Sequence, residues 1–118
     1  MIRHEPQVDG FRFTGVPTRL AKSVLYLLAH RFDTEVDPFP VGQFSLSAEL
    51  DAKGNNVNGG RDADQLKTDG EFTLRVVYQT DANILSVSVE AKADEADPSG
   101  IEYDVHDVLR NVFAQANY

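Results

Sequence analysis

"FTLRVVYQTDANILSVSVEAK", residues 72–92, has a pattern that defines the architecture of this chain. Its first half places large apolar side chains at every second position: Phe72, Leu74, Val76 and Tyr78. Its second half repeats this spacing: Leu85, Val87, Val89 and Ala91. Between the halves, TDAN is typical of a tight turn, because Asp and Asn favour turn conformations. The pattern predicts two neighbouring strands with one buried face and one polar face.

Residues 44–51, "FSLSAELD", repeat the same alternation. Their apolar side chains share one side of the strand: Phe44, Leu46, Ala48 and Leu50. Three strands of this design predict an antiparallel sheet whose second face stays open and polar. A shorter strand is expected in "VDGFRFTG", residues 8–15, where Phe11 and Phe13 point to one face of the strand and Arg12 points to the other.

Two helices are expected from apolar side chains at helical spacing. The first covers about residues 17–32 and begins with Pro17, which suits a first helical turn. Its apolar stripe is Leu20, Val24, Leu27, Leu28 and Phe32. The second covers about residues 100–116, and Ser99 and Glu102 have the spacing of a capping box at its start. Its stripe is Ile101, Val105, Val108, Leu109, Val112, Phe113 and Ala116.

The predicted order is strand, helix, three strands, helix. All the apolar surfaces are buried together when both helices pack on the same side of the sheet. We therefore expect an α+β fold: a two-layer sandwich of an antiparallel sheet of three to four strands with two helices on one face. The length of 118 residues fits a single domain over residues 1–118.

The composition is that of an ordinary globular protein. Apolar residues make up 42% and charged residues 25%, close to the averages for folded domains. The chain has no cysteine, which excludes disulfides, thiolate metal ligands and a cysteine nucleophile. The N-terminal residues lack the apolar run of a secretory signal, and no stretch reaches the ~18 to 20 apolar residues of a membrane span. We expect a soluble protein that is cytoplasmic, or part of a virion if its source is viral.

Charge is divided unevenly along the chain. The net charge is -8, yet residues 1–32 hold five basic and two acidic side chains, while the remainder holds six basic and seventeen acidic ones. Opposite charges on separate surfaces favour contacts between molecules. The first helix carries a basic face: Arg19, Lys22, Tyr26 and His30. The second carries an acidic face: Glu102, Asp104 and Asp107.

No catalytic or cofactor motif is present in the sequence. GxSxG, HExxH, a Walker loop and the dinucleotide fingerprint are all missing. His4 lies in a segment expected to be a flexible end, His30 on the polar face of the first helix, and His106 on a solvated face of the second. We expect no enzyme activity, no cofactor and no metal site, and a pair of distant carboxylates that meet in the fold stays open as a catalytic alternative.

A flexible loop is expected at about residues 52–70, because this connection is far longer than the ~2 to 5 residues of a usual hairpin loop. Two interpretations stay open. The loop is a tolerated insertion, since loop closure penalises length only weakly, or it is an arm that becomes ordered on a partner. In the second interpretation its contacts are Asn55, Asn56, Asn58, Arg61, Asp62, Asp64 and Lys67.

Part of this loop, GGRDADQLK at residues 59–67, approximates the calcium-binding nonapeptide GGxGxDxUx. That motif works by stacking copies, so that neighbouring turns share each ion. One imperfect copy is present, with Asp62 where the motif has glycine. The sequence therefore does not predict calcium binding.

Three resemblances bear on function. The order helix, three strands, helix is similar to that of the double-stranded RNA-binding domain, but that family contacts phosphates through lysines where this chain has Glu102, Asp104 and Asp107. Nucleic acid is therefore not an expected partner. The alternating strands within residues 44–92 resemble those of SecB-like secretion chaperones. In size and layout the chain resembles small phage assembly proteins such as tail-completion or connector subunits.

The sequence predicts a non-enzymatic protein-interaction or assembly subunit that is oligomeric and has itself or other assembly subunits as partners. The alternative is an acidic inhibitor, immunity or anti-defence protein that binds a basic partner through the second helix. A SecB-like chaperone or a small metal-dependent enzyme is the third hypothesis. No contact with membranes is expected.

Overall fold

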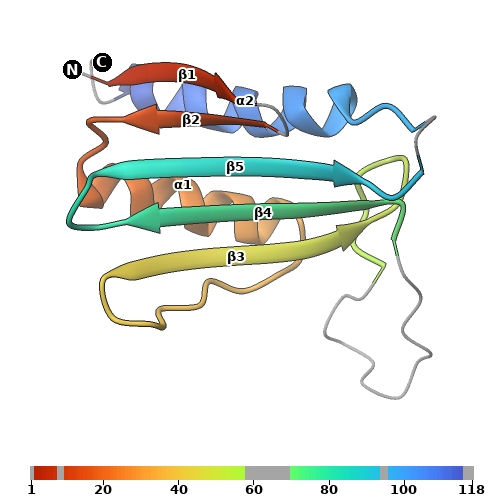
Figure 1. The fold of residues 1–118 in the computed structure, drawn as a ribbon, viewed down its shortest axis with the longest axis horizontal. Helices are drawn as coiled ribbons and strands as arrows, with labels where there is room; N and C mark the ends of the chain where they lie inside the picture. Colours follow the sequence, from red (N-terminus) through yellow and green to blue (C-terminus); the bar gives the residue numbers. More distant parts are fainter. Residues whose placement is uncertain (1, 8–9, 58–69, 94–95, 116–118) are drawn as a thin grey trace.

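The computed structural model describes residues 2–7, 10–57, 70–93 and 96–115 (Figure 1). Within these ranges the chain forms five strands and two helices, which confirms the predicted α+β class. In chain order they are β1 (Arg3–Gln7), β2 (Gly10–Thr14), α1 (Thr18–Arg31), β3 (Gln43–Leu50), β4 (Phe72–Gln79), β5 (Ile84–Ala91) and α2 (Ser99–Gln115).

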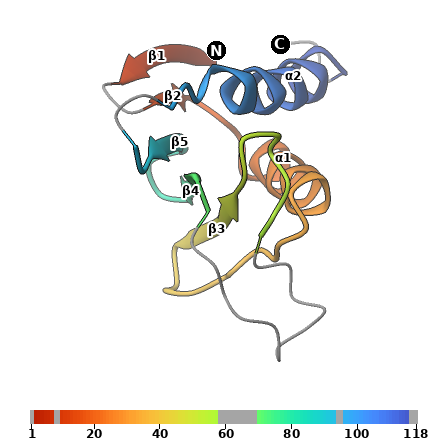
Figure 2. The same cartoon turned by 90° about the vertical axis from the view of Figure 1, so that its right-hand side faces the viewer.

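The strands form one antiparallel sheet in the order β1-β2-β5-β4-β3. Figure 2 shows both helices on the same side of this sheet, α2 near β1 and β2 and α1 nearer to β3. The helices run in opposite directions, so the N-terminal half of α1 lies beside the C-terminal end of α2 (Figure 1). The result is the expected two-layer arrangement, in which one sheet face is covered and the other is open.

The central hairpin has the predicted alternation. In its register Val76 pairs with Val87 and Tyr78 with Leu85, so the apolar side chains of β4 and β5 share one face. From the helices, Leu25 of α1 and Leu109 of α2 are fully buried against the core that this face forms. Burial of one continuous apolar surface is therefore what joins the two layers.

The N-terminal segment is a strand, and the expectation that His4 lies in a flexible end is wrong. β1 pairs with β2 along its whole length, and Glu5 forms an ion pair with Arg12 on the neighbouring strand. Pro6 has no backbone N–H to donate, which is tolerated because β1 is an edge strand. β1 brings the sheet to five strands.

The start of α2 is built differently from the expected capping box. The hydroxyl of Ser99 donates to the carboxylate of Asp97 at 2.9 Å, and the backbone N–H of Ser99 donates to the other oxygen of that carboxylate at 3.0 Å. These bonds lower the pKa of Asp97, with the backbone bond as the largest cause. Asp97 therefore places a negative charge at the positive end of the helix dipole.

Neighbouring segments cover the outer edge of β3. Asp37 forms an antiparallel bridge with Ser45, and the backbone N–H of Val57 donates to the Glu49 carbonyl at 2.9 Å. On the other side of the strand, where β3 pairs with β4, the backbone N–H of Glu71 donates to the Leu50 carbonyl at 2.8 Å. Gly70 is buried at this point, where a Cβ atom would lie 2.7 Å from the backbone of Leu50. Both ends of the connection from Val57 to Gly70 are therefore fixed to β3.

A buried tyrosine ties the sheet to the start of α1. The Tyr78 hydroxyl donates to the Val16 carbonyl at 2.6 Å and accepts from the side-chain amide of Asn83 at 2.9 Å. The backbone N–H of Val16 in turn donates to the Asn83 carbonyl at 3.0 Å. Asn83 has a φ of 55°, a left-handed conformation that Asn adopts more readily than most residues. The segment before α1 is thus fixed against the turn between β4 and β5.

Replacing Tyr78 with Phe should lower the free energy of unfolding by ~1 to 3 kcal/mol, because buried hydrogen-bonding groups lose a partner. Urea denaturation followed by circular dichroism measures this loss. Tyr26→Phe is the matched control, since Tyr26 is 63% exposed and should tolerate the change. Equal stability of the two variants would contradict the role given to the Tyr78 hydroxyl.

Candidate functional site

A groove lies between the two helices, along the basic face of α1. Its volume is about 630 Å³, and three of the four predicted basic-face residues line it; the fourth, His30, is exposed but lies outside the lining. We call this surface the helix groove. The lining side chains that matter below are Arg19, Leu20, Lys22, Tyr26, Leu27 and Val112.

Leu27 lies at the helix groove and not on the buried face of α1, where its place in the predicted stripe put it. Its side chain is 50% exposed. At 3.6 residues per turn, Leu27 is about 100° around the helix from Leu28. The buried face follows two rows of i, i+4 neighbours: Leu20, Val24 and Leu28, and Ala21, Leu25 and Ala29. When the alanines are counted as part of the buried stripe, its centre lies farther from Leu27. The side chain of Leu27 is therefore an apolar group on the exposed surface.

The two cations of the helix groove are available to another molecule. In the described part of the chain, neither Arg19 nor Lys22 forms an ion pair. The Lys22 ammonium lies 5.0 Å from the centroid of the Phe44 ring, a cation–π contact between α1 and β3. The groove therefore combines exposed apolar side chains with uncompensated positive charge.

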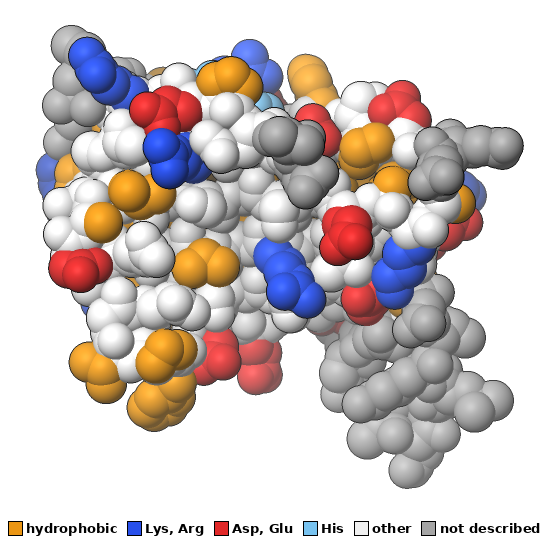
Figure 3. Space-filling view, in the orientation of Figure 1, with side chains coloured by type: hydrophobic (Ala, Val, Ile, Leu, Met, Phe, Trp, Pro, Cys, Tyr) orange, Lys and Arg blue, Asp and Glu red, His pale blue; other side chains and the backbone are white. Residues whose placement is uncertain are grey.

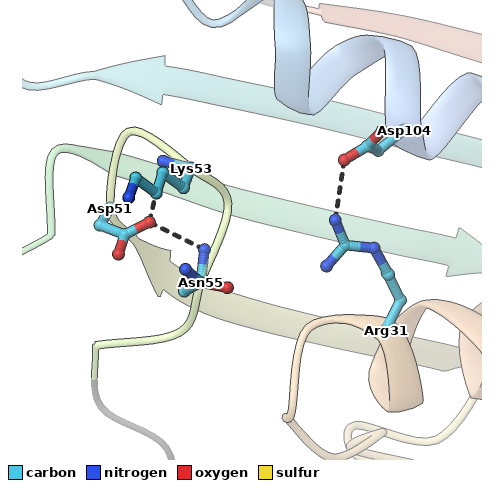
Figure 4. A network of polar contacts seen from close by, with 5 residues as sticks. All are labelled: Arg31, Asp51, Lys53, Asn55 and Asp104. Atoms are coloured by element: carbon cyan, nitrogen blue, oxygen red, sulfur yellow. Dashed lines mark hydrogen bonds and ion pairs between the residues drawn. The ribbon is translucent and has the colours of Figure 1, made fainter.

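The predicted acidic face of α2 is partly neutralised within the same chain. One carboxylate oxygen of Asp104 accepts from the guanidinium of Arg31 at 2.8 Å (Figure 4). Asp107 is exposed and Glu102 half-buried. Arg110 adds a positive charge on the same helix, where its guanidinium lies 5.9 Å from the Tyr103 ring centroid. This face is less negative than its sequence indicates.

Residues 51–57 are folded against the body of the protein, although residues 52–57 belong to the loop expected to be flexible. The Asp51 carboxylate accepts from the backbone N–H groups of Lys53 and Asn55 at 2.9 Å each (Figure 4). The bond from Asn55 is the main reason that the pKa of Asp51 is lowered. The side-chain amide of Asn56 donates at 2.9 Å to two backbone carbonyls just after α1.

Asn55 and Asn56 therefore hold a turn and a helix end in place within their own chain. The other predicted loop contacts lie outside the described residues: Asn58, Arg61, Asp62, Asp64 and Lys67.

The turn that leads into β3 exposes two apolar side chains, and sequence reasoning missed it. Phe39 is 69% exposed and Val41 is 94% exposed. The segment before β3 lies at the lower left of Figure 1, and apolar side chains gather at that corner in Figure 3. We call residues 37–43 the apolar turn. The signal in the sequence is "DPFPVG", in which large apolar residues stand among prolines that prevent any regular element from burying them.

Hydrogen bonds hold the apolar turn in one shape. The backbone N–H of Phe39 donates to the Asp37 carboxylate at 3.0 Å, and that of Gln43 donates to the Pro40 carbonyl at 3.2 Å. The backbone N–H of Thr80, in the turn between β4 and β5, donates to the Gly42 carbonyl at 3.0 Å. The exposed side chains thus project from a fixed base.

A cluster of aromatic rings joins β1, β2 and α2. His106 of α2 stacks on Phe11 of β2 with ring centroids 3.9 Å apart, and His4 of β1 lies 5.2 Å from His106. The expectation that His106 lies on a solvated helix face is therefore wrong. Burial lowers its pKa below 6.5, and the charges of His4 and Arg110 lower it further. His106 thus packs β1 and β2 against α2, and its burial disfavours the charged form.

The open face of the sheet is mostly white in Figure 3, with scattered charged and apolar side chains. Arg75 of β4 lies between Ser47 of β3 and Ser88 of β5 in the register of the sheet. Two hollows of about 340 and 390 Å³ share Arg75 in their linings. Hydroxyl groups and a guanidinium can bind polar ligands, but here they are spread along strands and do not converge on one point.

At one end of this open face, Glu49 accepts from Lys92 at 2.7 Å and from Thr73 at 2.9 Å. The bond from Lys92 is the main cause of the lowered pKa of Glu49. These contacts link Glu49 of β3 to Thr73 of β4 and to Lys92, which directly follows β5. The carboxylate of Glu49 is therefore already bound within its own chain.

No group of three or more His, Asp or Glu side chains in the described ranges is placed to hold a metal ion. Among the helices described, none is both long and apolar enough to cross a membrane. The features that stand out are the exposed apolar and basic side chains of the helix groove and the apolar turn, which suit non-covalent contacts.

Asn56→Ala should lower the free energy of unfolding by ~1 to 2 kcal/mol, because the carbonyls after α1 lose a donor. Asn111→Ala on the exposed side of α2 is the control. Guanidinium denaturation of both variants measures the difference. A loss for Asn56→Ala no larger than that for Asn111→Ala would show that the loop base does not support the helix end.

Stability should fall as the pH drops through about 6.5, the value at which His106 gains a proton in the unfolded chain. In the folded chain the pKa of His106 is lower, so over this window the unfolded state binds more protons and is favoured as the pH decreases. His106→Phe should therefore weaken the pH dependence between about pH 7 and pH 5.5.

His30→Gln is the control for this measurement, since His30 is exposed. Carboxylates with lowered pKa values, such as Glu49 and Asp51, titrate below the window. Melting temperatures of the three proteins across the pH range give the comparison. An unchanged slope in His106→Phe would refute the role of the aromatic cluster in acid sensitivity.

Comparison with known proteins adds no relative: no family model, no curated protein and no solved structure matches this chain.

Proposed function

We propose that this protein is a non-enzymatic interaction subunit that docks other proteins through the helix groove and the apolar turn. One observation carries the proposal: among the described residues, four of the five large apolar side chains that are exposed belong to these two surfaces. They are Tyr26, Leu27, Phe39 and Val41. Apolar side chains gathered on the surface of a folded domain mark contact sites.

The kind of residue also favours docking. Aromatic side chains and arginine are enriched in the energetically important parts of protein interfaces. The helix groove has both, with Tyr26 and Arg19 in its lining. The apolar turn presents Phe39 from a base fixed by hydrogen bonds, so little conformational entropy is lost when it binds.

The charge of the helix groove selects the kind of partner. The protein as a whole has a net charge of -8, yet the groove carries Arg19 and Lys22 without acidic neighbours in its lining. A basic groove with apolar walls suits a protein segment that carries acids and large apolar side chains. Complementary charge mainly adds specificity and speeds association.

The alternative of an acidic inhibitor that binds through α2 has less support. Asp104 is bonded to Arg31 in the same chain, and Arg110 lies on the same helix as Glu102 and Asp107. We propose instead an assembly component, working in the cytoplasm or in a virion, of the kind represented by phage tail-completion or connector subunits.

A synthetic peptide of four glutamates and two phenylalanines should bind in the helix groove. In an NMR titration at low salt, amide shifts should change at Arg19, Lys22 and Leu27, with millimolar affinity, a binding free energy of roughly -4 kcal/mol. A peptide with lysines in place of the glutamates is the first control. Lys22→Glu should weaken binding of the acidic peptide, and a response spread evenly over the surface would count against a docking groove.

A further inference from the structure

We propose that the partner is a second copy of this chain, with the apolar turn of one copy bound in the helix groove of the next. This inference rests on the proposed docking function and names its partner. The turn carries the two most exposed of the large apolar side chains described, Val41 and Phe39. In the groove, the exposed apolar side chains of Tyr26 and Leu27 stand over a floor to which the buried Leu20 and Val112 contribute.

The charges of the two surfaces are complementary. Glu35 lies just before the apolar turn and Asp37 is its first residue, and both are exposed. Within the described residues neither forms an ion pair. Arg19 and Lys22 in the lining of the groove are the matching cations. Acidic residues beside an apolar tip thus fit a basic groove with an apolar wall.

The other acidic surface of the chain is a poorer match for the groove. On α2, Asp104 is already bonded to Arg31, and the exposed Tyr103 ring has the guanidinium of Arg110 nearby. If Tyr103 docked in the groove, Arg110 would lie near the groove cations Arg19 and Lys22, and repulsion between these like charges would oppose docking. The apolar turn has no such cation among residues 37–43.

The shape of each surface also favours contact between copies. The apolar turn is held by backbone bonds to Pro40 and Gly42 before any partner is present, so it keeps its conformation on binding. No residue of the turn lines the groove of its own chain. The contact joins two different surfaces, so two copies can exchange turns in a two-fold dimer, or copies can add head to tail into a ring or a filament.

Two variants separate the surfaces. The turn variant is Phe39→Ser with Val41→Asp, and the groove variant is Lys22→Glu with Leu27→Glu. All four positions are exposed, so both proteins should fold, which circular dichroism checks. Val41→Asp alone is the second turn variant, because Val41 is 94% exposed and its replacement removes no core contact.

Light scattering after size-exclusion chromatography measures the result. The wild-type protein should exceed the mass of one chain, and should lose mass as salt is raised, because screening weakens the charge contacts. Each variant alone should have the mass of one chain. In an equal mixture, the intact turn of the groove variant can bind the intact groove of the turn variant. The mixture should therefore have the mass of two chains and no more. Tyr103→Ser, an exposed change outside both surfaces, should assemble like the wild type.

A wild-type protein that stays at the mass of one chain up to about 1 mM overturns the self-contact. Variants that assemble like the wild type, or a mixture that does not pair, overturn it as well. The acidic peptide distinguishes the two proposals. If the single-chain protein still binds that peptide in the groove, the docking function stands and the partner is a different protein. If it neither assembles nor binds the peptide, both proposals fail.

Discussion

The hydroxyl of Tyr78 donates to the Val16 carbonyl at the point where the chain leaves the sheet and turns into α1. Because Asn83 binds both of these groups, the segment before α1 has one position relative to the central hairpin. That position directs α1 to the apolar side of the sheet, where α2 covers the remaining surface (Figure 2). The apolar side chains that the core does not bury include those of the surfaces proposed for docking: Leu27 on α1 and Phe39 and Val41 before β3.

The sequence predicts those parts of the fold that bury a regular apolar pattern. β4 and β5 have the expected buried and polar faces, and α1 begins and ends within one residue of the predicted bounds. Apolar residues repeated every two positions indicate a strand and every 3.6 positions a helix, so few other assignments fit these segments. β1 has no such pattern. Backbone pairing, the Glu5–Arg12 ion pair and the packing of His4 beside Phe13 hold it, and these contacts become visible only after β2 is in place.

The helix groove and the neutralised acidic face of α2 were harder to predict, because each combines segments that are distant in sequence. The helix groove needs Val112 beside Leu20, and the neutralisation of Asp104 needs Arg31, which is 73 residues away. The basic face of α1 could be read from its sequence, as three of its four residues line the groove. The loop composition predicts Asn56 as a partner contact because Asn favours turns, but its amide is used by the chain itself.

Val57 and Gly70 are both anchored to β3, so the stability of the folded body depends little on the length of the segment between them. Val57 is bonded to the Glu49 carbonyl, and Glu71 to the carbonyl of the next residue, Leu50, so the two ends stay close together. Loop closure becomes only slightly less favourable as a segment grows. This position can thus accept a grafted epitope or an inserted module while the core side chains keep their packing, which makes it an attachment point on the scaffold.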